Sequence, residues 1–75
     1  MILIDSYDGK KILIVGFGKT GSSTARSLNN SGADIFIWDD NKSLRELAIE
    51  NGFSIYDYKK HNIKKFDEII WSPGV

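Results

Sequence analysis

The fold is decided at residues 11–21, which read Lys-Ile-Leu-Ile-Val-Gly-Phe-Gly-Lys-Thr-Gly. The four branched apolar residues at 12–15 are typical of a parallel strand that is covered on both faces. The Gly16-x-Gly18-x-x-Gly21 turn allows a sharp bend, a close approach to a ligand, and a helix packed against the strand. The start of such a helix has free N–H groups and the positive end of the helix dipole, which favour a phosphate. The stretch therefore predicts a nucleotide-binding unit.

Strands and helices are expected to alternate along the rest of the chain. Helices are predicted at 21–30 and from a capping box at Ser43–Glu46 to a stop at Gly52. Strands are predicted at about 11–15, 33–39, 53–58 and 69–71. This order predicts an α/β fold with a Rossmann-like, doubly wound parallel sheet and right-handed crossovers.

Three loops are expected to meet at the carboxyl ends of the strands, where ligands bind in open parallel sheets. They are residues 16–21, 39–41 and 72–75. Asp39 follows Gly21 by 18 positions. That spacing is close to the one at which an acid at the end of the second strand binds a ribose hydroxyl.

Composition excludes several classes of function. Ten acidic and ten basic residues give a net charge of zero, so no overall charge favours nucleic acid or an anionic membrane. The sequence has no cysteine, which is compatible with the cytoplasm, and no stretch of transmembrane length. We find no Ser/His/Asp set and no metal-ligand spacing, and therefore predict no catalytic residue and no metal site.

Three further features are interpreted as structural. Gly18-Lys-Thr20 is not the end of a P-loop, because that motif needs a glycine at position 13, which is Leu13. The basic run at 59–65 is interpreted as a solvated connection. Trp38 and Trp71 are interpreted as core residues in strands.

Four segments together resemble the N-terminal domain of the Mur ligases that join D-glutamate to UDP-N-acetylmuramoyl-L-alanine (MurD). They are Gly9-Lys-Lys11, Gly16-Phe-Gly-Lys-Thr-Gly21, Trp38-Asp-Asp40 and Ser72-Pro-Gly-Val75. The resemblance runs from about Ser6 to Val75. It implies a cytoplasmic enzyme of peptidoglycan synthesis that uses ATP and Mg²⁺. Residues 1–75 would be its incomplete UDP-binding domain, truncated after the fourth strand, with no cofactor and no catalysis of its own.

The resemblance also implies roles for individual residues in binding UDP-N-acetylmuramoyl-L-alanine. The helix start would contact the diphosphate, the end of the second strand would meet uracil and ribose, and the end of the fourth would close over the nucleotide. The residues are Gly18, Lys19, Thr20 and Gly21, then Asp39, Asp40 and Asn41, then Ser72, Pro73 and Gly74.

Two other functions remain open from the residues alone. The same pattern opens NAD-dependent oxidoreductases, and it occurs in stand-alone nucleotide-sensing modules. Ser72-Pro-Gly74 and Thr20-Gly21 favour the ligase. We also expect the apolar fourth strand, left as an open edge, to let copies of the chain associate.

Overall fold

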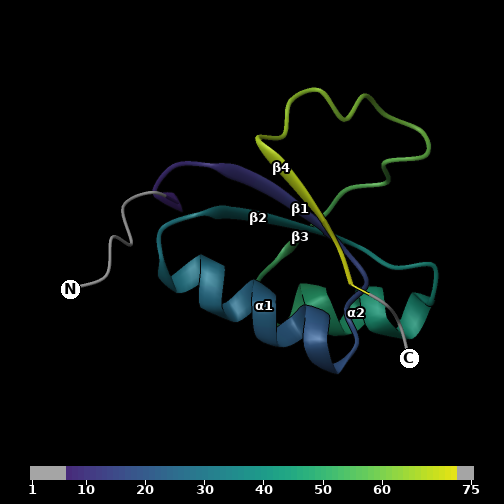
Figure 1. Cartoon of the computed structure of the whole chain (residues 1–75). Helices are drawn as coiled ribbons and strands as arrows, with labels where there is room; N and C mark the ends of the chain where they lie inside the picture. Colours follow the sequence, from purple (N-terminus) through teal and green to yellow (C-terminus); the bar gives the residue numbers. More distant parts are fainter. Residues whose placement is uncertain (1–6, 73–75) are drawn as a thin grey trace.

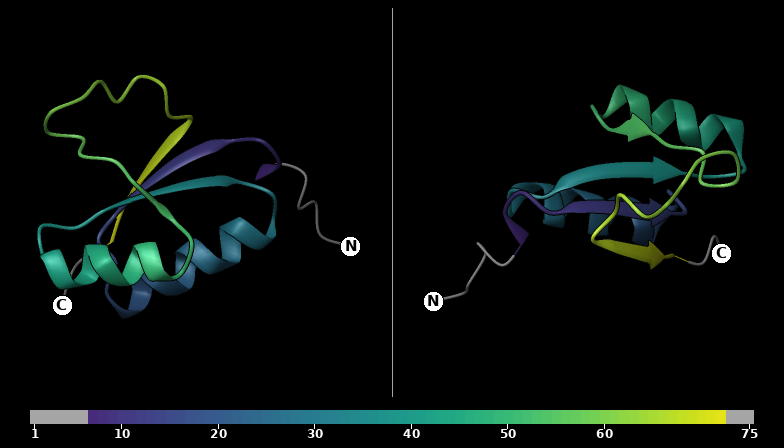
Figure 2. Two further views of the ribbon diagram at one scale, coloured as in Figure 1. Left: turned by 180° about the vertical axis from the view of Figure 1, so that it is seen from behind. Right: turned by 90° about the horizontal axis from the view of Figure 1, so that it is seen from above.

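Four parallel strands form one sheet in the computed structural model, which describes residues 7–72 (Figure 1). In sheet order β3-β2-β1-β4, the strands are Ser54–Ile55, Asp34–Trp38, Lys11–Val15 and Glu68–Trp71. Val15 is the register partner of both Trp38 and Trp71, so the carboxyl ends of the three longest strands are level. Figure 2 shows their arrowheads at one side of the sheet. The predicted α/β, Rossmann-like fold is confirmed.

Both helices cover the same face of the sheet (Figures 1 and 2). Helix α1 (Lys19–Asn30) links β1 to β2, and α2 (Lys42–Glu50) links β2 to β3. Two right-handed crossovers in the same direction put both helices on one side. The core lies between them and the sheet, and consists of Ile12, Ile14, Phe17, Ala25, Ala33, Ile35, Ile37, Ala48 and Phe53.

The second face of the sheet is crossed by the irregular connection from β3 to β4, residues 56–67 (Figure 1). Phe36 of β2 lies under this segment and packs edge-on against Tyr56 and Phe66, with ring centroids 6.3 and 5.3 Å apart. The ammonium of Lys65 lies 4.7 Å from the centroid of the Tyr56 ring. Leu13, which alternates with the core residues of β1, is fully buried as well. Both faces of β1 are therefore covered, as its apolar run predicted.

Element boundaries differ from the expectations in two helices. The prediction of a capping box at Ser43 was wrong, because Asn41 caps α2. The side-chain oxygen of Asn41 accepts from the N–H of Ser43 at 2.8 Å and from the N–H of Leu44 at 3.3 Å. Asparagine is as strong a cap as serine, and β2 ends early enough for the helix to begin at Lys42. Helix α1 likewise begins at Lys19, two residues before the prediction.

Two strand expectations were also wrong. Strand β3 has two residues, because the chain leaves the sheet after the N–H of Tyr56 donates to the carbonyl of Ile37 at 3.0 Å. Trp71 is not a core residue, since 62% of its surface is exposed. It lies on the outermost strand, where the ring of Tyr58 packs edge-on against it at 5.5 Å.

Within residues 7–72, β1 is the only strand paired with β4. Association of copies through the outer edge of β4 stays a prediction. Neither helix in this part of the chain is long and apolar enough to cross a membrane.

We predict that Ile14→Ala lowers the free energy of unfolding by about 2–5 kcal/mol, because it leaves a cavity between β1 and the helices. Ile49→Ala is the control: this side chain is 58% exposed on α2, and its loss should change stability by less than about 0.5 kcal/mol. Urea unfolding followed by circular dichroism measures both. Equal losses of stability in the two variants would contradict the placement of Ile14 in the core.

Candidate functional site

The turn after β1 is held in place by its two neighbouring strands. The N–H of Gly16 donates to the carbonyl of Trp38 at 2.7 Å, and the N–H of Ser72 donates to the carbonyl of Val15 at 2.8 Å. Gly16 has φ +111°, and a Cβ at this position would overlap the carbonyl oxygen of Ser72. Only glycine therefore permits the ends of β1 and β4 to approach this closely.

The start of α1 packs directly on the same turn. A Cβ at Gly21 would overlap the carbonyl oxygen of Gly16, whereas a Cβ at Gly18 would meet no atom within 4 Å. The first helical hydrogen bond is donated by the N–H of Ser22 to the carbonyl of Gly18 at 2.9 Å. The N–H groups of residues 19–21 therefore precede the helical ladder.

Within residues 7–72, no side chain caps the positive end of α1. Gly18 is the N-cap and supplies no side-chain cap, and the first turn contains no acidic residue. Lys19 and Thr20 are exposed there. This helix start can accept an anion without displacing a protein group.

Asp39 joins the turn after β1 to the turn after β2. One carboxylate oxygen accepts from the N–H of Phe17 at 2.8 Å, and the other accepts from the N–H of Asn41 at 2.8 Å. The sequence predicted that this acid lies at the carboxyl end of β2, which the structure confirms, but not that it links two loops. Each carboxylate oxygen has a second lone pair with which it can accept from a ligand hydroxyl.

Asp40 is held by side chains from two elements. One of its oxygens accepts from the indole N–H of Trp38 at 3.1 Å and from the ammonium of Lys59 at 2.6 Å. The hydrogen bond from Lys59, followed by that from Trp38, lowers the pKa of Asp40, and the bond to Asp40 raises the pKa of Lys59. Both groups therefore stay charged around neutral pH.

Arg45 of α2 holds the backbone of the same turn. Its guanidinium donates to the carbonyls of Asp39 and Asp40 at 2.7 and 3.1 Å and lies 4.7 Å from the centroid of the Trp38 ring. Sequence reasoning missed Arg45 and Lys59. The position of Arg45 one helical turn after the cap could have indicated it, because it faces back toward the start of α2.

Ser72 completes the described part of the site. Its hydroxyl oxygen is buried and has no hydrogen-bond partner among residues 7–72. It lies 3.2 Å from the position of a Cβ on Gly21, next to the start of α1. Pro73 and Gly74, which were also predicted to bind, lie outside the described residues.

The structure thus brings residues 16–21, residues 39–41 and Ser72 together at the carboxyl end of β1, with Asn41 at the start of α2. Within the described residues, no group of three or more His, Asp or Glu side chains could hold a metal ion. The arrangement offers N–H donors, a hydroxyl and carboxylate acceptors, which suits binding of a phosphorylated, hydroxylated ligand.

Comparison with known families decides the relationship. Residues 10–75 match the model of the Mur ligase MurD-like N-terminal domain. The chain belongs to this family. It is 39% identical to the UDP-N-acetylmuramoylalanine–D-glutamate ligases of Paramagnetospirillum magneticum and Bartonella henselae, each over 75 residues. It is 37% identical to that of Ruegeria pomeroyi over 76 residues. In each case the match covers 100% of this chain and 16% of the relative.

A solved structure shares the fold. A putative D-3-phosphoglycerate dehydrogenase from Ralstonia solanacearum superposes with a TM-score of 0.80, at 22% identity, over 92% of this chain and 20% of that one. At this identity the likeness shows the Rossmann-like fold of the MurD-like domain and nothing about its ligand.

Gly21→Ala is expected to destabilise the domain by at least about 2 kcal/mol, since the new methyl group would overlap backbone that cannot move without separating α1 from β1. Gly18→Ala is the matched control. It adds the same methyl group to open space at φ −75°, and should cost no more than about 1 kcal/mol, the penalty of alanine at an N-cap. Thermal unfolding compares the two variants, and equal stabilities would refute the close contact.

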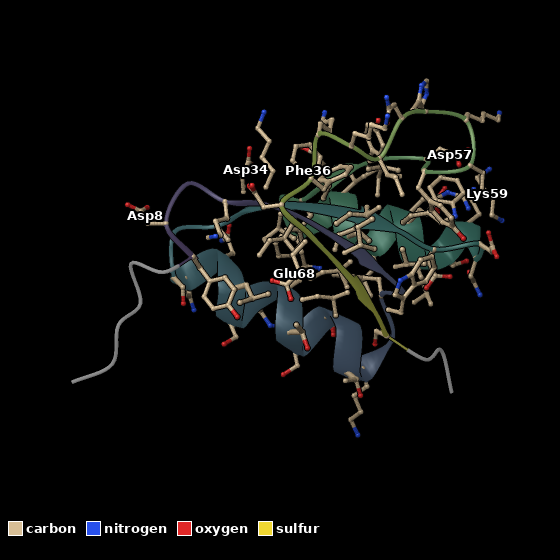
Figure 3. The ribbon with its side chains drawn as sticks, turned by 45° about the horizontal axis from the view of Figure 1, so that its top comes forward. Asp8, Asp34, Phe36, Asp57, Lys59 and Glu68 are labelled. Carbon is tan, nitrogen blue, oxygen red and sulfur yellow. The ribbon has the colours of Figure 1, made fainter. Side chains whose placement is uncertain are left out.

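Asp39→Ala should lower stability by about 1–2 kcal/mol, because the N–H groups of Phe17 and Asn41 lose their acceptor. Asp34→Ala removes an exposed carboxylate at the other end of β2 and should have little effect (Figure 3). Urea unfolding measures both variants. If Asp39→Ala is as stable as Asp34→Ala, the carboxylate does not join the two turns.

Proposed function

We propose that the chain binds the UDP moiety of UDP-N-acetylmuramoyl-L-alanine, as part of a ligase that adds D-glutamate to this peptidoglycan precursor. The observation that carries the proposal is the convergence of the uncapped start of α1, the turn at 39–41 and the buried hydroxyl of Ser72 at one edge of the sheet.

The diphosphate is assigned to the start of α1. The N–H groups of residues 19–21 are available there, and the open space in front of Gly18 lets a phosphate approach the backbone. Lys19 would add a positive charge and Thr20 a hydroxyl donor. The Ser72 hydroxyl would donate to a phosphate oxygen and so gain the partner that it lacks among the described residues.

The uridine is assigned to the turn after β2. The free lone pairs of Asp39 suit a ribose hydroxyl or the uracil N–H, and the side-chain amide N–H₂ of Asn41 suits a uracil carbonyl. Asp40 would contribute through its backbone, because its carboxylate is already held by Trp38 and Lys59.

The ligase activity is proposed from the family. The relatives are named UDP-N-acetylmuramoylalanine–D-glutamate ligases, and this chain spans 16% of their length. We propose that ATP, Mg²⁺ and D-glutamate bind to other parts of a longer, cytoplasmic protein, and that these 75 residues do not catalyse the reaction.

We predict that UDP shifts the amide NMR signals of residues 18–21 and 39–41 at lower concentration than NAD does, with a dissociation constant of about 1 mM. Gly18→Ala should weaken UDP binding while the domain stays folded, since its methyl group would occupy the space assigned to a phosphate. Tighter binding of NAD at these amides would favour the oxidoreductase instead. Unchanged UDP affinity in Gly18→Ala would contradict the placement of the diphosphate.

A further inference from the structure

Lys59 is far along the sequence from the turn that follows β2, but its side chain contacts this turn. It lies 19 positions after Asp40, in the connection that crosses the second face of the sheet, and its ammonium is 2.6 Å from the Asp40 carboxylate. Figure 3 shows Lys59 beside Asp57, at the end of the molecule opposite Asp8 and Asp34. The pair therefore joins the β3–β4 connection to the proposed uridine site.

The backbone around Lys59 is shaped to present this side chain. The carboxylate of Asp57 accepts from the N–H of Lys59 at 2.9 Å, and the carbonyl of Asp57 accepts from the N–H of Lys60 at 3.2 Å. The ring of Tyr58, the residue before Lys59, packs edge-on against Trp71 at the end of β4, with ring centroids 5.5 Å apart. Lys59 is thus placed by a turn that Asp57 closes and that Tyr58 anchors to β4.

The Lys59–Asp40 pair is too exposed to be explained by stability. The two side chains are 50% and 75% exposed, and ion pairs in such positions contribute little to folding. Asp40 receives a second hydrogen bond from Trp38, while Arg45 holds the carbonyls of Asp39 and Asp40. Side chains from β2, α2 and the connection thus all bind this turn.

We propose that Lys59 is a positioning residue for the nucleoside, which acts by holding Asp40 and so setting the conformation of the turn at 39–41. This inference rests on the proposed function, because it assumes that the turn binds uridine. Lys59 itself does not need to touch the ligand. Of the cations at 59, 60, 64 and 65, Lys59 alone forms an ion pair in the described structure.

The test measures UDP affinity of the whole chain by NMR titration in five variants. Lys59→Met should weaken UDP binding about threefold to fivefold, and Lys59→Arg should restore it, because arginine can also donate to the Asp40 carboxylate. Lys60→Met removes the same charge one position away, where the described structure shows no side-chain partner, and should leave the affinity unchanged. In an Asp40→Ala background, measured alone and with Lys59→Met, the second substitution should cause no further loss, because Lys59 then has no acceptor at position 40.

A spectroscopic signal separates positioning from a general loss of structure. The indole N–H of Trp38 shares its acceptor with Lys59, so its NMR signal should shift in Lys59→Met and stay in place in Lys60→Met.

Three other outcomes would contradict one or both proposals. If the chain binds UDP and Lys59→Met binds it equally well, the positioning role is refuted while the proposed function stands. If Lys60→Met weakens binding as much as Lys59→Met, the loss is a general effect of charge and the positioning role is refuted. If the unmodified chain binds no UDP, both proposals fail.

Discussion

The contact between the Cα of Gly21 and the carbonyl oxygen of Gly16 is the constraint on which the rest of this structure depends. It has no room for a Cβ, and neither has the neighbouring approach of Gly16 to Ser72. Because α1 starts against the end of β1, its free N–H groups open onto the carboxyl edge of the sheet. The same approach brings the Ser72 hydroxyl to this helix start. A packing requirement of the backbone therefore creates the proposed phosphate site.

The nucleoside side of the site depends on charge and hydrogen bonding instead. Asp39 ties its own turn to the turn after β1, and Arg45 and Lys59 hold the residues on either side of the Asp39–Asp40 peptide bond. Two carboxylates next to each other would repel an anionic ligand, and the two cations offset them. The turn is consequently close to neutral, which suits a ligand that carries a diphosphate.

Much of this could be predicted from sequence, because the signals are local. The run at 12–15, the three glycines and the acid at 39 follow spacing rules that hold for any chain with a strand–turn–helix unit. Lys59 could not be predicted, since it is one of several cations in an irregular segment and only the path of that segment selects it. The exposure of Trp71 was missed for a related reason: the sequence pattern of an apolar strand is the same at the centre of a sheet and at its edge.

The most direct test of the account is a crystal structure of the chain bound to UDP. The account predicts that the diphosphate oxygens accept hydrogen bonds from the N–H groups of residues 19–21 and that uracil and ribose lie against the turn at 39–41. A structure in which UDP binds elsewhere, for instance on the lysines of the β3–β4 connection, with the start of α1 empty, would contradict it.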